Sequence, residues 1–225
     1  MTEYVLSIDP GLSTGVALLS YEEDSPAELV KAWQFTGGVS GLTAWRKTHW
    51  RGAYRDSEWG YEFGPRFSPD PGRFWDLHVE TLYEEQYNPD TDEYDEVETE
   101  KKNLTVICEK FTARNNRGFS YTTASLEPLR GEGALIDRGI MPDYTVAEKR
   151  WRDPSLQYFA GGTGKAERKK KQHSFLKANG FYRTGKDFGT ADADDFRSAC
   201  AHGIAYIARE LHHRPTWDLI SSWEN

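Results

Sequence analysis

The first 36 residues alternate between apolar runs and short polar breaks. Apolar and β-branched residues dominate 3–9, 15–21 and 29–35, and Gly11 and Gly15 punctuate the first break. Runs of this length, bounded by turn residues, are typical of strands. The pattern therefore predicts a meander of three strands joined by turns.

Further apolar runs and helical patterns follow. The segments 104–111 and 144–148 are rich in β-branched residues and predict a central fourth strand and a fifth strand. Helical spacing predicts helices over 71–86, 122–139, 164–180 and 190–213; Gly139 and Gly180 end the second and third, and Pro215 lies just past the last. The predicted fold class is α/β, a five-stranded mixed sheet with helices packed on both faces.

Two segments interrupt this order. Residues 37–70 are rich in Gly, Trp and Arg and have no sustained period, which predicts an irregular insertion. Residues 88–102 are strongly acidic and predict a solvated loop, ordered or disordered. A chain of 225 residues can build one sizeable core, so we interpret 1–225 as a single domain with these two insertions.

Charge is distributed unevenly along the chain. The net charge of −8 by itself argues against a polyanionic partner. However, residues 84–100 hold nine carboxylates and no Lys or Arg, whereas 110–190 hold 16 Lys and Arg against 8 Asp and Glu. The basic half therefore has the charge balance of a nucleic-acid-binding surface.

Hydropathy and cysteine usage narrow the class of protein. No apolar run approaches the roughly 18 residues of a membrane span, and the first residues lack the layout of a signal peptide. We expect a soluble, cytoplasmic protein with no membrane partner. Cys108 and Cys200 lie in apolar segments and are expected to be buried free thiols. No CxxC or HxxxH spacing indicates structural zinc.

Carboxylates stand at the edges of three predicted elements. Asp9 ends the first strand and Glu109 the fourth. Asp192 and Asp195 extend the apolar stripe of the last helix to its start, whereas Asp194 turns away. Each alone has an ordinary reading, as a turn former, a strand end in water or a helix start.

Together these carboxylates indicate a metal site. Converging carboxylates repel one another, and burial favours their protonated forms. A hard divalent cation such as Mg²⁺ or Mn²⁺ prefers oxygen ligands and neutralises such a cluster. Two such ions could activate water and stabilise the leaving oxygen of a phosphodiester.

The order of these motifs resembles RuvC-type Holliday-junction resolvases of the ribonuclease H-like superfamily. I-D-P-G-x-x-x-G follows the first strand, Glu ends the fourth, and A-D-x-x-D opens the last helix. The resemblance covers Tyr4 to about Ala208 apart from the two insertions. It implies a ribonuclease H-like sheet whose first three strands are antiparallel. It also implies two Mg²⁺ or Mn²⁺ ions per active site, with the catalytic and metal-binding residues Asp9, Glu109, Asp192 and Asp195.

The same resemblance implies the activity. Members of the family act as homodimers that nick two opposed strands of a four-way junction. We therefore expect a crossover-junction endodeoxyribonuclease, a phosphodiester hydrolase of DNA recombination and repair. The chain departs from bacterial members in a shorter first turn and in its two insertions. These departures suit a bacteriophage version that works in the host cytoplasm on junctions, flaps or forks.

Basic and aromatic residues around the motifs are candidates for DNA contacts. Five basic residues fall within 165–171, and the alternative is an ordinary solvated helix surface. In the family a lysine of this helix lies near the scissile phosphate, and Arg168 matches that position best. Three aromatic residues are rivals for the stacking role at the junction. The expected DNA-binding residues are Lys165, Arg168, Lys169, Lys170, Lys171, Arg114, Arg117, Lys149, Arg150 and the aromatics Phe111, Phe119 and Tyr121.

The insertion at 37–70 has two readings. Its residues Trp45, Trp50 and Trp59 are interleaved with arginines and could stack on unpaired bases. A packed subdomain or a dimer contact is the alternative.

Three other functions remain open. A related ribonuclease H-like nuclease would act on RNA:DNA hybrids or flaps. An actin-like or sugar-kinase-like ATPase would need a second glycine-rich phosphate loop and an adenosine site, and the sequence shows neither. A non-catalytic binder of branched DNA would not need all four acidic positions.

Overall fold

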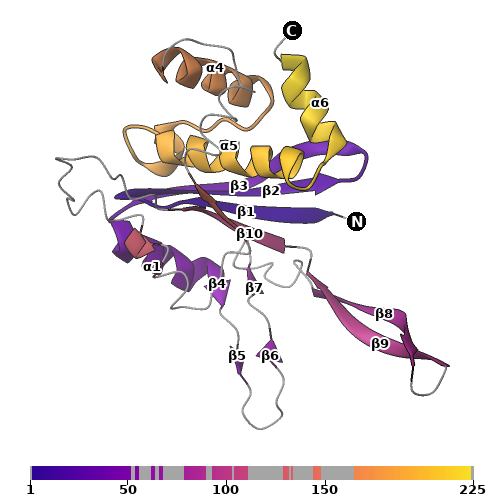
Figure 1. Ribbon diagram of the computed structural model, residues 1–225. Helices are drawn as coiled ribbons and strands as arrows, with labels where there is room; N and C mark the ends of the chain where they lie inside the picture. Colours follow the sequence, from indigo (N-terminus) through magenta and orange to yellow (C-terminus); the bar gives the residue numbers. More distant parts are fainter. Residues whose placement is uncertain are drawn as a thin grey trace, which may run out of the picture.

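The centre of the protein is a mixed β-sheet, seen edge-on in Figure 1. The computed structural model describes residues 2–51, 54–55, 62–63, 66–67, 79–89, 93–102, 104–110, 129–131, 133, 144–147 and 165–223. The sheet has the strand order β11-β10-β1-β2-β3. Its strands are β1 (Glu3–Asp9), β2 (Ser13–Glu22), β3 (Ser25–Thr36), β10 (Leu104–Lys110) and β11 (Tyr144–Ala147).

Strand directions follow the sequence prediction. β1, β2 and β3 pair antiparallel, whereas β10 is parallel to β1 and β11 is parallel to β10. Short turns join the first three strands, while longer segments precede β10 and β11. The predicted mixed α/β sheet with an antiparallel first meander is confirmed.

Alternation along the strands builds two cores, one on each face of the sheet. Val5, Ala17 and Ile107 are buried on one face, and Leu6 and Val106 on the other. Successive side chains of a strand point to opposite faces, so each strand contributes side chains to both cores. The sheet is therefore buried on both sides, as the apolar runs in the sequence predict.

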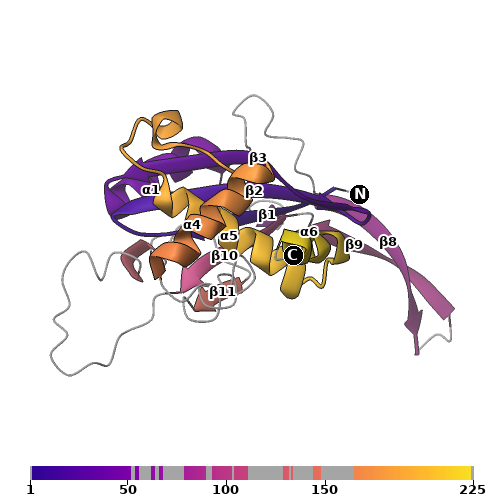
Figure 2. The ribbon, with the colours of Figure 1, turned by 90° about the horizontal axis from the view of Figure 1, so that it is seen from above.

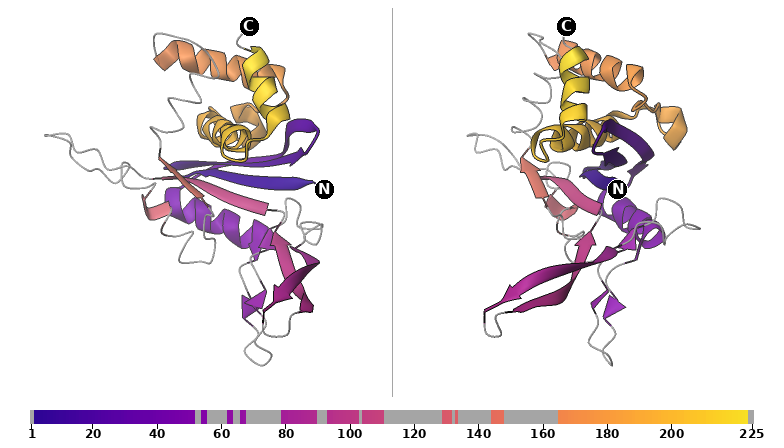
Figure 3. Two further views of the ribbon diagram at one scale, coloured as in Figure 1. Left: turned by 45° about the vertical axis from the view of Figure 1, so that its right-hand side comes forward. Right: turned by 90° about the vertical axis from the view of Figure 1, so that its right-hand side faces the viewer.

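In the described part of the chain, helices α4 (Lys165–Ala178), α5 (Asp194–Arg209) and α6 (Arg214–Trp223) lie over one face of the sheet, and α1 (Gly38–His49) lies over the other (Figures 1 and 3). The short 3₁₀ helix η2 (Gly185–Phe188) precedes α5. From above, α4 lies over α5 (Figure 2). The described part of the chain contains no helix that could cross a membrane.

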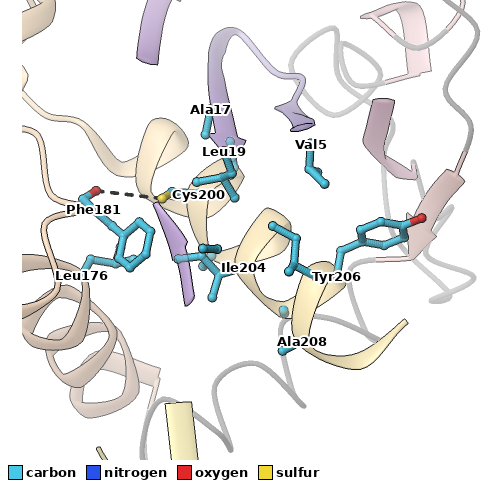
Figure 4. Packing of buried hydrophobic residues seen from close by; sticks show 14 of the residues in the cluster. Val5, Ala17, Leu19, Leu176, Phe181, Cys200, Ile204, Tyr206 and Ala208 are labelled. Carbon is cyan, nitrogen blue, oxygen red and sulfur yellow. Dashed lines mark hydrogen bonds between the residues drawn. The ribbon is translucent and has the colours of Figure 1, made fainter. Parts of the chain in front are cut away.

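Helix α5 supplies much of the first core (Figure 4). Its residues Cys200 and Ile204 are fully buried between the sheet and α4. Gly203 allows close approach, because an added Cβ would lie 2.5 Å from a side-chain atom of Leu19. Cys108 and Cys200 are both buried and free, as predicted.

The structure corrects the predicted helix over 71–86 and the predicted loop over 88–102 where these segments are described. Val79–Asn88 and Glu93–Lys102 are the strands β8 and β9, whereas residues 71–78 lie outside the described residues. The two strands pair antiparallel along their whole length and project from the body (Figures 1 and 3). The physical reason is cross-strand pairing between two segments of equal length, which outweighs the local helical spacing and the acidic charge.

The structure also corrects the prediction of an irregular insertion from residue 37. Residues 38–49 form α1, which buries Leu42 and Trp45 in the second core. The Trp45 ring lies edge-on to Trp33, with centroids 5.7 Å apart, and stacks on Phe35 at 6.0 Å. The base-stacking reading is therefore wrong for Trp45. Of Trp50 only the backbone is described, and Trp59 lies outside the described residues.

After α1 the described chain forms short antiparallel pairs. β4 (Trp50–Arg51) pairs with β7 (Arg66–Phe67), and β5 (Tyr54–Arg55) pairs with β6 (Glu62–Phe63). Of the predicted helix over 122–139, residues 129–131 and 133 are described and are helical.

The predicted last helix over 190–213 corresponds to α5 (Asp194–Arg209), and α6, which the sequence pattern did not predict, follows it. α5 ends at Arg209, and α6 begins at Arg214, with Pro215 in its first turn rather than beyond a helix end. His213 stands at the junction and is buried. Its Nδ1 lies 2.8 Å from Thr216 Oγ1, and its Nε2 lies 2.8 Å from the carbonyl oxygen of Glu22. His213 thus ties α6 to the β2–β3 hairpin.

Candidate active site

Two carboxylates lie side by side where β1 and β10 end. Asp9 is the last residue of β1, and Glu109 is the penultimate residue of β10. The preceding residues, Ile8 and Cys108, are partners in the parallel register and are buried in the core on the α1 face. Because side chains alternate, Asp9 and Glu109 belong to the opposite face, where α5 lies.

The first turn of α5 rests on β2 beside this point. Gly15 of β2 is the register partner of Asp9. A Cβ added at Gly15 would lie only 2.1 Å from the backbone carbon of Asp195. Glycine is therefore required here for close packing, and this packing places Asp195 beside the strand that neighbours Asp9. Asp9, Glu109 and Asp195 thus lie on the same face and at the same end of the sheet, and their convergence on a metal site stays a prediction.

Gln34 lies on the sheet beneath α5 and holds the start of this helix through two hydrogen bonds. It lies in β3 opposite Gly15. Its side-chain nitrogen donates to the carbonyl oxygen of Asp192 at 2.8 Å, and its side-chain oxygen accepts from the backbone N–H of Phe196 at 3.0 Å. Sequence reasoning missed this residue. The available signal was a polar side chain between two aromatic residues of a strand, which alternation directs toward α5.

Replacing Gln34 tests this clamp. In Gln34→Leu the N–H of Phe196 stays buried without its acceptor, so we expect the free energy of unfolding to fall by about 2 kcal/mol. The control is Gln172→Leu on the half-exposed side of α4, which we expect to change the stability by less than about 0.5 kcal/mol. Urea unfolding measures both. Equal stability of the two variants would contradict the role given to Gln34.

Burial governs the electrostatics of Asp195. Desolvation raises the pKa of this half-buried carboxyl, and the neighbouring charges of Asp192 and Asp194 raise it further. The Ser13 hydroxyl and the more distant charge of Lys169 act in the opposite direction. The net result is a raised pKa, so an additional positive charge at this position would be favourable.

The raised pKa predicts a stability effect. Because the folded-state pKa of Asp195 exceeds that of the unfolded chain, its contribution to stability is present at low pH and is lost as the pH rises through the raised pKa. Asn cannot ionise. We therefore expect Asp195→Asn to have a higher urea midpoint than the wild type at pH 7 in EDTA, with a difference that shrinks toward pH 3.8.

The exposed Asp24 of the β2–β3 turn provides the control for that measurement. Asp24→Asn should leave the midpoint unchanged at both pH values. A lower midpoint for Asp195→Asn than for the wild type at pH 7 would contradict the assigned cost of burying this carboxylate.

Asp192 differs from the expectation that it extends the buried stripe of α5. It is exposed, because the helix begins at Asp194 and the buried residue before it is Ala193. One carboxylate oxygen of Asp192 accepts the backbone N–H of Asp194 at 3.0 Å. Among the described residues, no three His, Cys, Asp or Glu side chains are grouped closely enough to hold a metal ion. The donors have the hard-oxygen chemistry that Mg²⁺ or Mn²⁺ prefers, and their elements meet at one place, but the side chains are not gathered into a coordination group.

Asp194 turns away from this site toward α4, as predicted. Its carboxylate pairs with the ammonium of Lys169 and lies 3.4 Å from an Arg197 guanidinium nitrogen. Burial opposes ionisation of Asp194, but the hydrogen bond and charge of Lys169 hold its pKa below the ordinary value. His173 lies 3.7 Å from the same carboxylate, and its pKa is lowered, first by burial and then by Arg197.

The described part of α4 carries several expected DNA contacts. The side chains of Lys169 and Lys170 are exposed, and that of Lys171 is half-buried. Lys165 and Arg168 belong to the same helix, but only their backbone is described. The other expected contacts lie outside the described residues: Arg114, Arg117, Lys149, Arg150, Phe111, Phe119 and Tyr121.

The fold has a neighbour among proteins of known structure. No protein-family model and no curated protein matches the chain. Its fold is similar to that of Thermus thermophilus RuvC, solved in complex with a Holliday junction substrate. The TM-score is 0.44 and the sequence identity 13%, over 93% of this chain and 96% of the other.

Proposed function

We propose that the chain is a metal-dependent, structure-selective endodeoxyribonuclease that nicks Holliday junctions or other branched DNA. One observation carries the proposal. Three elements far apart in the sequence bring Asp9, Glu109 and Asp195 to one end and one face of the sheet. Half-burying the charged Asp195 carboxylate costs free energy, as its raised pKa indicates. Such perturbed carboxylates are typical of catalytic sites.

The proposed cofactor is a pair of Mg²⁺ or Mn²⁺ ions held by Asp9, Glu109, Asp192 and Asp195. Bound ions would activate water and stabilise the leaving oxygen of a phosphodiester. The protein contributes a rigid frame: the sheet fixes Asp9 and Glu109, and the packing on Gly15 and the Gln34 clamp fix the start of α5. Such support is what a catalytic constellation needs.

The basic half of the chain would hold the DNA. Lysines of α4 lie next to α5, so phosphates bound there would lie close to the carboxylates. We propose the same role for the expected basic and aromatic contacts outside the described residues, and a homodimer that would present two sites to two opposed strands. Contacts of this kind give affinity and salt dependence rather than sequence readout.

A panel of labelled substrates tests the proposed activity. Four-way junctions, flaps, forks, linear duplex and an RNA:DNA hybrid are incubated with the wild type in Mn²⁺, in Mg²⁺ and in EDTA. We expect nicks in branched DNA that require the metal ion and are absent from linear duplex. Cleavage of the hybrid alone would identify a related ribonuclease H-like enzyme instead, and survival of every branched substrate would contradict the proposal.

A further inference from the structure

A basic groove runs along α4 on the side facing Tyr182. It has a volume of about 430 Å³ and is lined by Ala166, Lys169, Lys170, His173, Ser174, Lys177 and Tyr182. The helical members recur every three or four residues, so they form one face of α4. On the opposite side of the helix, Phe175 and Leu176 are fully buried in the core. The groove face is therefore held in a fixed orientation.

One wall of the groove is a fixed aromatic ring. The hydroxyl of Tyr182 accepts a hydrogen bond from Arg197 at 2.8 Å, and the guanidinium carbon of Arg197 lies 4.5 Å from the centre of the ring. The lining holds three lysines and no carboxylate. From Ala166 to Lys177 the helix rises about 16 Å, the length of about five nucleotides of one B-form strand.

The carboxylate of Asp194 stands beside this groove, next to Lys169 and His173 of its lining. It pairs there with Lys169, while Arg197 and His173 lie beside it. A carboxylate and a phosphate oxygen compete for the same ammonium hydrogens. Asp195, the next residue, belongs to the proposed catalytic set, so the part of the groove beside Asp194 lies close to the proposed site of cleavage.

We infer that the groove binds the phosphate backbone of one DNA strand and that Asp194 occupies Lys169 until a phosphate displaces it. The inference rests on the proposed function for the identity of the ligand and extends it to Ser174, Lys177, Tyr182 and Asp194. Lys177 lies at one end of the groove lining, and Lys169 lies beside the carboxylate of Asp194. Asp194 therefore lowers the affinity for any phosphate backbone, whatever its sequence.

Binding without cleavage tests the inference. Affinity for a labelled four-way junction is measured in EDTA over a series of salt concentrations. We expect Asp194→Asn to bind about fivefold more tightly, with the salt slope steeper by about one, because Lys169 becomes free for a phosphate. Lys177→Ala should bind about fivefold more weakly, with the slope reduced by about one.

Each variant has a control with the same change in charge. Asp218 pairs with Arg214 on the exposed side of α6, and Lys31 is exposed on β3. Asp218→Asn and Lys31→Ala are expected to bind as the wild type does. Thermal unfolding verifies that Asp194→Asn is folded, and Lys177→Ala removes only an exposed side chain.

The outcomes separate this inference from the proposed nuclease. If Asp194→Asn and Lys177→Ala match their controls, the groove does not hold the strand, even where the wild type nicks junctions. If both variants shift as expected while the wild type nicks nothing in Mn²⁺, the inference about the groove is supported and the proposed nuclease activity is contradicted. If the wild type has no measurable affinity for DNA, the inference that the groove binds a DNA strand is contradicted directly.

Discussion

Asp9→Asn is expected to lower the rate of Mn²⁺-dependent nicking by about 10³-fold, equivalent to about 4 kcal/mol of transition-state stabilisation, with junction binding unchanged. The amide keeps the shape of the side chain but removes the negative charge that a divalent cation requires. Asp9 ends β1 at the centre of the proposed site, where the sheet holds its backbone in place. Single-turnover cleavage and EDTA binding assays measure the two properties separately.

Asp24→Asn provides the comparison, because Asp24 is exposed in the turn between β2 and β3. This variant should nick at the rate of the wild type. Nicking by Asp9→Asn within tenfold of the wild type would remove Asp9 from the site. Loss of junction binding in Asp9→Asn would show a structural effect rather than the loss of a metal ligand.

Gly15→Ala is expected to lower the free energy of unfolding by about 3 kcal/mol and to impair nicking in the protein that remains folded. The added methyl carbon would lie 2.1 Å from the backbone carbon of Asp195 and 2.3 Å from the backbone nitrogen of Phe196. Neither atom belongs to a flexible side chain, so α5 itself would have to move. That movement would separate Asp195 from Asp9.

Gly133→Ala is the matched change, because an added Cβ at Gly133 meets nothing within 4 Å. Nicking by this variant should equal that of the wild type, and its urea midpoint should be equal or slightly higher, because alanine replaces glycine in a helix. If Gly15→Ala is also as stable and active as the wild type, the contact between β2 and α5 is not what positions Asp195.

Local pattern in the sequence was enough for the elements that form the sheet. Apolar runs bounded by turn residues predicted β1 to β3, and β-branched runs predicted β10 and β11. The sequence placed Asp9 and Glu109 at the ends of their strands, and alternation puts both on the α5 face, since each lies one residue beyond a buried residue of the other face. The basic helix α4 was also predicted, within one or two residues of its ends.

Long-range pairing was the information that the local pattern did not contain. β8 reads as helical by spacing, and β9 reads as loop by its acidity, but each is a strand because the other is its partner. α1 has only a weak hydrophobic periodicity of its own, and it forms because Leu42 and Trp45 pack on the sheet. Tertiary contacts override weak local preference in both cases.

Within the candidate site, the same limit explains Gln34 and Asp192. The spacing of Asp192 to Phe196 is helical, but α5 begins only at Asp194, so Asp192 is exposed beside the helix start. Its carbonyl oxygen is instead the point that Gln34 holds, across 158 residues of sequence. Neither feature follows from the residues near Asp192.

Binding of Mn²⁺ tests most directly whether the carboxylates of β1, β10 and the start of α5 act as one metal site. Electron paramagnetic resonance follows free Mn²⁺ during titration of the wild type, Asp9→Asn, Asp195→Asn and the control Asp24→Asn. We expect up to two ions per chain in the wild type and in Asp24→Asn, and markedly weaker binding in Asp9→Asn and Asp195→Asn alike. Identical titrations for all four proteins would contradict the site.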